Sequence, residues 1–165
     1  MKLVIKEYIS TLKESGELDA LIPDILLNMG IKPLSKAQRG VRQYGVDISA
    51  VGIDPEDGKK KLFLITVKEG DITRNDWKGG SLQDVRTSLD EIKDVAIPLL
   101  TDPSHQKLPK KIIVSTNGEM HQNVENNWKG YKKSNETSKI EYDFWGIDKL
   151  TLLIDEWNCY KKMDS

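Results

Sequence analysis

The stretch YGVDISAVGIDPEDGKKKLFLITVKEG, residues 44–70, decides the fold of this chain. It contains two β-rich runs, at 46–53 and 62–67, separated by the segment DPEDGK at 54–59. The proline and the Asp-Gly pair of that segment favour a hairpin-type turn. The two runs are therefore predicted to be neighbouring strands.

Each of these strands carries an ionisable residue, Asp47 in the first and Lys68 in the second. A buried charge in a strand needs a partner or a metal ion. Since side chains alternate along a strand, Thr66 and Lys68 project to one face, which Asp47 of the neighbouring strand can reach. The pair fits a metal-dependent phosphodiesterase, in which an acid binds the cation and a lysine stabilises the transition state. It equally fits a structural ion pair.

The bulk composition favours a single globular domain spanning residues 1–165, with 38% hydrophobic and 31% charged residues. No apolar run is long enough to cross a bilayer, and the N-terminus lacks a signal-peptide core. The single cysteine, Cys159, excludes an internal disulfide and a cysteine-based zinc site. These features indicate a cytoplasmic protein.

The formal net charge of −1 provides no global basic field that would attract nucleic acid. Lysines gather locally at 59–61, 107–111 and 129–133. We interpret these clusters as solvated faces.

Periodicity outside the hairpin predicts alternating helices and strands. Helices are expected over 3–14, from Asp19 to Gly30, from Ser81 through Leu99, weakly over 119–133, and around 150–157; further strands are expected over 110–118 and 139–147. Residues 33–44 are interpreted as a short strand or loop. This order predicts an α/β fold, with a mixed central sheet flanked by helices on both faces.

Three segments together resemble a known family: LDALIPDILLNMGI at 18–31, YGVDISAV at 44–51 and FLITVK at 63–68. They are similar to the PD-(D/E)xK nuclease superfamily, and within it to the Mrr-like restriction endonuclease branch. The resemblance covers about the first hundred residues, together with KIIVS and DFWGIDKL further on. It implies a restriction-endonuclease-like core, in which a helix, a three-strand meander, a helix and a strand follow one another.

The resemblance also implies roles for individual residues. Asp47 matches the metal-binding aspartate and Lys68 the catalytic lysine. Asp19 matches the acid of the first helix, although a helix cap is its more frequent use. The backbone carbonyl of Val67 would complete the metal shell, and the implied cofactor is Mg²⁺ or Mn²⁺.

Thr66 departs from the family pattern, which has a carboxylate or amide at this position of the catalytic motif. A neutral hydroxyl binds divalent metal far less well, so the second ligand has moved, metal binding is weak, or catalysis is lost. Glu69 is expected on the opposite face of the strand. Asp71 lies in a loop that could fold back, and it is the better replacement ligand.

Several polar residues flank the expected cleft in sequence and suit contacts with nucleic-acid phosphates, although solvated loop residues are the commoner explanation. They are Arg39, Arg42, Gln43, Arg74, Gln83 and Arg86. Trp128 and Tyr131 suit either base stacking or anchoring of a polar helix to the core. Trp145 and Trp157 are interpreted as core residues.

The resulting hypothesis is a metal-dependent nuclease that hydrolyses DNA phosphodiester bonds, as the nuclease domain of a restriction or phage-defence protein. A homodimer and further domains or subunits of such a system are compatible with it. The alternative is a catalytically inactive nuclease-like module that binds nucleic acid or a protein partner. An RNA-directed enzyme on the same fold is a second alternative.

Overall fold

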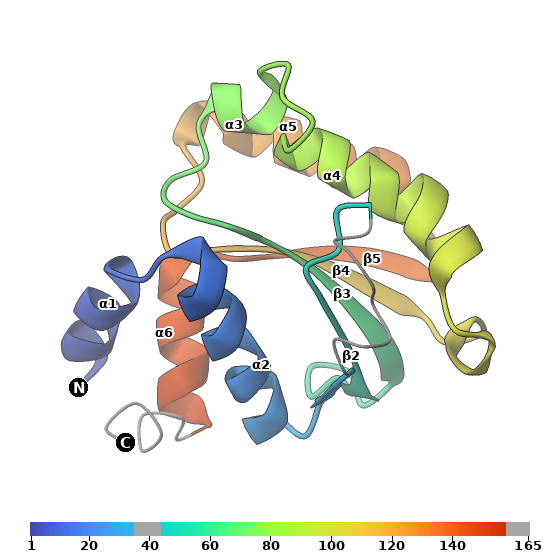
Figure 1. The fold of residues 1–165 in the computed structure, drawn as a ribbon, viewed down its shortest axis with the longest axis horizontal. Helices are drawn as coiled ribbons and strands as arrows, with labels where there is room; N and C mark the ends of the chain where they lie inside the picture. The colour runs from blue at the N-terminus through green and yellow to red at the C-terminus, as the bar shows by residue number, and fades with distance from the viewer. Residues whose placement is uncertain (35–43, 158–165) are drawn as a thin grey trace.

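A computed structural model describes residues 1–34 and 44–157, and it places a mixed β-sheet between two layers of helices (Figure 1). The strands are β1 (Lys32–Pro33), β2 (Ile48–Ile53), β3 (Lys60–Lys68), β4 (Lys110–Thr116) and β5 (Ile140–Trp145). The helical segments are α1 (Lys2–Ser10), the irregular turn η1 (Glu14–Leu18), α2 (Asp19–Asn28), α3 (Arg74–Lys78), α4 (Val85–Glu91) with its wider continuation η3 (Ile92–Leu100), η4 (Pro103–His105), α5 (Gln122–Asn135) and α6 (Ile147–Glu156).

The five strands lie in their sequence order, β1-β2-β3-β4-β5. The predicted hairpin is present: β2 and β3 are antiparallel, with Ile48 opposite Ile65 and Ile53 opposite Lys60. Strands β3, β4 and β5 are mutually parallel, because helices carry the chain back between them. The α/β fold and the mixed sheet expected for a restriction-endonuclease-like core are therefore confirmed.

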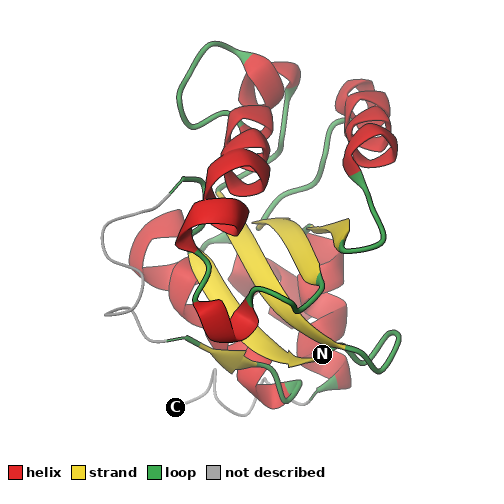
Figure 2. Ribbon diagram, turned by 90° about the vertical axis from the view of Figure 1, so that its right-hand side faces the viewer, coloured by secondary structure: helices red, strands yellow, loops and turns green. Residues whose placement is uncertain are grey.

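The two faces of the sheet pack against different helices, as Figure 2 shows in the turned view. Phe63, Ile65 and Val67 of β3 belong to one hydrophobic cluster with buried residues of α1, α2 and α6. Leu62 and Leu64 belong to a second cluster with residues of α3, α4 and α5. Because side chains alternate along β3, Thr66 and Lys68 share the second face.

Both aromatic residues of the weakly predicted helix α5 anchor it to the second face. Trp128 and Tyr131 are buried, and Trp77 of α3 meets each of them edge to face, at centroid distances of 6.4 and 5.9 Å. Such contacts stabilise a helix whose remaining residues are mostly polar. In this structure the two aromatic rings serve the core.

The helix expected from Ser81 begins later, at Val85. The Ser81 hydroxyl accepts the N–H of Gln83 in a turn, and Leu82 is left exposed. Leu99, expected on the apolar face of the same helix, is also exposed. The start of the helix and the burial of Leu82 and Leu99 were predicted wrongly, because the apolar spacing continues beyond the buried part of the helix, whereas the helical segment does extend through η3 to Leu100.

Asn117, directly after β4, connects α1 to the sheet. Its amide nitrogen donates to the carbonyls of Ile9 at 3.1 Å and Leu12 at 2.7 Å, while its carbonyl accepts the N–H of Gly70 at 2.8 Å. Asn117 is buried, so these hydrogen bonds satisfy backbone groups that water does not reach. The end of α1 is thereby held against the ends of β3 and β4.

Within residues 1–34 and 44–157, none of the helices has the length and apolar character that a membrane span requires.

Candidate active site

Asp47 lies one residue before β2 and continues the antiparallel pairing with β3. Its backbone N–H donates to the carbonyl of Ile65 at 2.9 Å. Since Ile48 is opposite Ile65, the next position places Asp47 beside Thr66, on the face that packs against α4. The β2–β3 turn and the alternation of side chains along the strands therefore place Asp47 next to Thr66, as the sequence predicts.

The Asp47 carboxylate is held by β3. Its Oδ2 atom accepts the N–H of Val67 at 2.7 Å and lies 3.4 Å from the hydroxyl of Thr66. Asp47 is half-buried, whereas Thr66 is fully buried. A hydrogen bond from a backbone N–H fixes the orientation of a carboxylate.

Lys68 reaches the segment that precedes α4. Its Nζ atom donates to the carbonyl of Gln83 at 2.6 Å and lies 3.5 Å from the hydroxyl of Ser88. That segment is fixed by the buried carboxylate of Asp84, which accepts the N–H groups of Gly79 and Gly80, both at 2.9 Å. The position of the ammonium group is therefore set by α4 as well as by β3.

Asp47, Thr66, Val67 and Lys68 thus come together at one end of the β2–β3 hairpin. The group offers one carboxylate, one hydroxyl and one ammonium group. Hard oxygen atoms of this kind suit Mg²⁺ or Mn²⁺, with water completing the shell, because Mg²⁺ retains several of its waters. A site with a single carboxylate binds such a cation more weakly than a site with two carboxylates would.

The other predicted metal ligands lie on separate elements and have turn-forming contacts. Asp19, the first residue of α2, accepts the N–H of Gly16 in the preceding turn at 2.8 Å, and α2 has no side-chain cap, so the expected cap role of Asp19 was wrong. Asp71 is exposed, and its Oδ1 atom accepts the N–H of Glu119 at 2.9 Å. Glu69 points to the opposite face, as expected, where it accepts the N–H of Glu14 at 2.9 Å.

The described members of the predicted nucleic-acid surface are exposed and lie along the α3–α4 segment. Arg74 is the first residue of α3. The backbone carbonyl of Gln83 accepts the hydrogen bond from Nζ of Lys68. The guanidinium of Arg86 lies 6.0 Å from the centroid of the Tyr131 ring. The remaining three members, Arg39, Arg42 and Gln43, lie outside the described residues.

A second charged cluster, at the other end of β3, was missed in the sequence. Lys61 and Lys111 are each only 3% exposed, although both belong to lysine runs interpreted as solvated. Lys61 is spaced by two and four residues from the buried Phe63 and Ile65, so the three side chains share one face of β3. Lys111 has the same two-residue spacing from the buried Ile113 of β4. This period-two placement with buried residues was the signal that could have identified them.

The centre of this cluster is Asp54, which is 2% exposed. Its Oδ2 atom receives the ammonium groups of Lys61 at 2.8 Å and Lys111 at 2.9 Å. Burial raises the pKa of the Asp54 carboxyl, and the two lysine hydrogen bonds lower it by more, so that its pKa lies below the ordinary value. The same contacts raise the pKa values of both lysines against the effect of burial.

Asp54, Asp57 and Glu141 present carboxylate oxygens that all lie within 4.8 Å of one another, a spacing that a metal ion could use. Lys61 already lies among them, with Nζ 2.8 Å from Asp54, 2.7 Å from Asp57 and in contact with Glu141. The lysine therefore supplies the positive charge at this position, and no metal is needed to explain the three acids.

The sequence matches no protein-family model and no curated protein. Among solved structures, the fold is similar to that of "MspJI Restriction Endonuclease in Complex with 27-mer Oligonucleotide", with a TM-score of 0.39 and 13% sequence identity. The match covers 93% of this chain and 30% of that one, so this chain spans less than a third of its length. The Mrr-like branch stays a prediction.

Proposed function

We propose that this chain is a divalent-metal-dependent nuclease that hydrolyses phosphodiester bonds of DNA. The observation that carries the proposal is the meeting of Asp47, Thr66 and Lys68 on one face of the hairpin. Asp47 Oδ2 lies 2.7 Å from the Val67 nitrogen and 3.4 Å from the Thr66 hydroxyl. This placement supports one acid and one lysine acting on the same substrate group.

In the proposed mechanism, Asp47, the Thr66 hydroxyl and the Val67 carbonyl would hold Mg²⁺ or Mn²⁺. Asp19 and Asp71 lie on separate elements and would have to leave their contacts with Gly16 and Glu119 to add further oxygen atoms. When bound, the cation lowers the pKa of a coordinated water and neutralises phosphate charge. Lys68 stabilises the negative charge that develops on the phosphate oxygens, which is worth most where water is excluded. The Gln83 carbonyl orients the ammonium group for this role.

DNA would approach along the α3–α4 segment beside Lys68. Arg74 and Arg86 are exposed there, and their charges suit phosphate contacts that set the position of the backbone. Because the net charge of the chain is −1, binding is expected to be weak and to fall steeply with salt. Binding that does not change with salt would contradict phosphate contacts. Cleavage of both strands would require two copies of the site, as in a homodimer.

Thr66 favours a second candidate function, a catalytically inactive module that binds DNA. The side chain at the second ligand position is neutral and fully buried. Lys68 is held by a backbone carbonyl, a contact that also serves a purely structural role. Such a module would retain the salt-dependent surface without hydrolysing the backbone.

Cleavage of supercoiled plasmid and of labelled single-stranded DNA, with Mg²⁺ or Mn²⁺, separates the two candidates. The variants are Lys68→Ala and Asp47→Ala, with Lys2→Ala as the matched control, because Lys2 is an exposed lysine of α1, in the helix layer on the opposite face of the sheet. Metal-dependent nicking that both variants lose and the control keeps supports the nuclease. Salt-sensitive binding without cleavage supports the inactive module. Cleavage that survives both substitutions contradicts the proposed site.

A further inference from the structure

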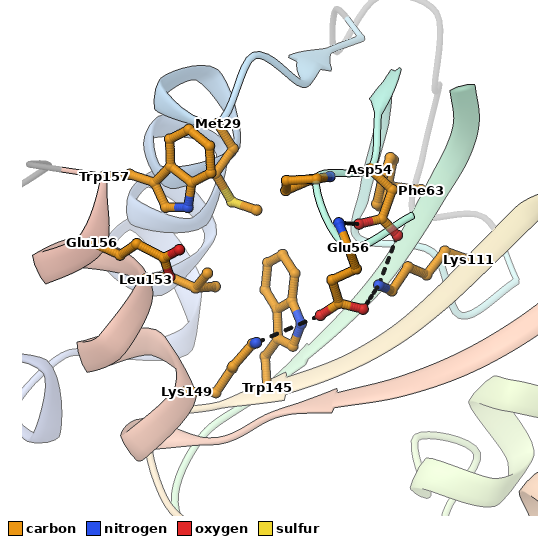
Figure 3. Close-up of a pocket in the computed structure, with 11 residues that line it drawn as sticks. Met29, Asp54, Glu56, Phe63, Lys111, Trp145, Lys149, Leu153, Glu156 and Trp157 are labelled. Atoms are coloured by element: carbon orange, nitrogen blue, oxygen red, sulfur yellow. Dashed lines mark hydrogen bonds and ion pairs between the residues drawn. The ribbon is translucent and has the colours of Figure 1, made fainter. Parts of the chain in front are cut away.

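A cavity of about 120 Å³ lies on the other face of the sheet, at the turn end of β3 and away from Lys68. Its apolar lining consists of three aromatic rings, a thioether, a leucine and a proline: Phe63, Trp145, Trp157, Met29, Leu153 and Pro55. Figure 3 shows Trp157 and Met29 on one side of the cavity, with Glu56 and Lys111 on the other. Aromatic faces and a polarisable sulfur are suited to an alkylated cation.

The polar wall of the cavity carries an excess of negative charge. Three carboxylates line it, from Asp54, Glu56 and Glu156, against the two ammonium groups of Lys111 and Lys149. The excess persists across the connected ion-pair network. There, five carboxylates (Asp54, Glu56, Asp57, Glu141 and Asp143) share three ammonium groups (Lys61, Lys111 and Lys149).

Two helices end at this cavity. Met29 is the C-cap residue of α2 and Trp157 that of α6, and both line it. The carbonyl end of a helix carries partial negative charge and favours a cation. Neither helix has a basic residue in its last turn, and both last turns are within the described part of the chain. The position therefore combines acids, helix carbonyl ends and aromatic faces.

We propose that this cavity binds a small organic ammonium ion, with its alkyl groups against Trp145, Trp157 and Met29 and its charge facing Glu56 and Glu156. A compact inorganic cation is less suited, because much of the wall is apolar and such ions hold their water strongly. An alkylated ammonium is weakly hydrated and gains from aromatic faces. The proposal does not depend on hydrolysis of DNA at Asp47 and Lys68.

Nuclear magnetic resonance of the tryptophan side chains provides a test with an internal control. The chain has four tryptophans, of which Trp145 and Trp157 line the cavity. Trp77 and Trp128 belong to the cluster on the opposite face. Titration with choline chloride, at constant total chloride, is expected to shift the indole N–H signals of the first pair and to leave those of the second pair unchanged.

Three comparisons identify the ligand class. The neutral isostere 3,3-dimethyl-1-butanol is expected to bind at least about fivefold more weakly than choline, because it lacks the charge. Trp157→Leu is expected to weaken choline binding about fivefold and Trp157→Phe much less, since phenylalanine keeps a ring. Glu156→Gln should weaken binding about threefold at low salt. The matched Glu125→Gln, on α5 of the opposite layer, should have no effect.

Equal binding of choline and its neutral isostere would overturn the proposal, since the cavity would then select apolar groups only. Inorganic phosphate that shifts the same indole signals more tightly than choline would also overturn it, in favour of an anion site at Lys111 and Lys149. Absence of any shift for Trp145 and Trp157, in protein whose spectrum shows it to be folded, would exclude a site here.

Discussion

The backbone N–H of Val67 donates to Oδ2 of Asp47 over 2.7 Å, so that β3 itself orients the acid of the candidate active site. The contact joins two adjacent strands, and it does not require a metal ion to hold the carboxylate in place. Asp47 is therefore oriented before any ligand binds, and metal binding at the site depends on the neighbouring side chain at position 66, which is Thr66.

Thr66→Glu tests whether the missing carboxylate limits metal binding. A second acid in this fully buried position faces Asp47, so we expect a loss of about 2–3 kcal/mol in the free energy of unfolding without metal. Mg²⁺ or Mn²⁺ at a hundred times its dissociation constant should restore about 2.7 kcal/mol. Thermal unfolding with and without the cation measures both effects.

Thr66→Gln is the control for this experiment, because it has the same bulk without the charge. We expect it to be destabilised by its size and to gain no more from the cation than the unchanged protein does. If Thr66→Glu responds to Mn²⁺ no more than Thr66→Gln, the hairpin end is not a metal site.

Asp54→Asn tests the buried ion-pair cluster. The substitution leaves Lys61 and Lys111 without their shared carboxylate, and removal of one partner from a buried pair costs about 3 kcal/mol in the free energy of unfolding. Glu56→Gln is the comparison, because the Glu56 side chain is 56% exposed and its loss should cost less than about 1 kcal/mol. Urea unfolding at neutral pH measures the two variants, and similar losses would contradict a central role for Asp54.

The stabilisation by Asp54 should depend on pH in a defined window. Because the pKa of its carboxyl is lowered in the folded protein, its contribution is complete above the ordinary value of 3.8 and is lost as the pH falls through the folded-state value. The difference in unfolding free energy between the unchanged protein and Asp54→Asn should therefore be constant near neutrality and should narrow below pH 3.8. If the difference in unfolding free energy widened on acidification instead, the pKa of Asp54 would be raised in the folded protein and not lowered, which would contradict this prediction.

Gly45→Ala should disturb the entry into the candidate active site. Gly45 has φ +82°, and an added Cβ atom would lie 2.4 Å from the carbonyl oxygen of Ser88 in α4. The strain and the overlap together should cost about 3 kcal/mol in the free energy of unfolding. Gly58 has φ +73° with no neighbour within 4 Å, so Gly58→Ala isolates the strain at about 1 kcal/mol. If urea unfolding gave both variants the same loss of unfolding free energy, α4 would be able to shift at Ser88 and relieve the overlap.

Much of the arrangement around the hairpin could be predicted from the sequence. The turn DPEDGK and the alternation of the flanking strands determine which residues face one another, and these local features brought Asp47 to Thr66. The helix α4, which follows Lys68 in the chain, was harder to delimit. Its true start depends on the buried carboxylate of Asp84 binding two glycine N–H groups, a contact that apolar spacing does not reveal.

The second charged cluster could not be predicted for a different reason. Lys61 and Lys111 belong to lysine runs that look solvated, and their burial depends on carboxylates from two other segments, Asp54 in the β2–β3 turn and Glu141 and Asp143 in β5. A single sequence gives the residue types but not these long-range pairings. The same is true of the cavity, whose walls combine the ends of α2 and α6 with the β2–β3 turn.

The hydrogen bonds from Asn117 to the carbonyls of Ile9 and Leu12 impose an order on folding. Helix α1 and the Asn117 side chain that holds its end are more than a hundred residues apart in the sequence. Contacts of such long range form after local ones, since the intervening chain must first be closed. We therefore expect the amides of α1 to gain protection from hydrogen exchange late in refolding, after those of the β2–β3 hairpin. Helix α1 is thus expected to dock onto the sheet after the hairpin has formed.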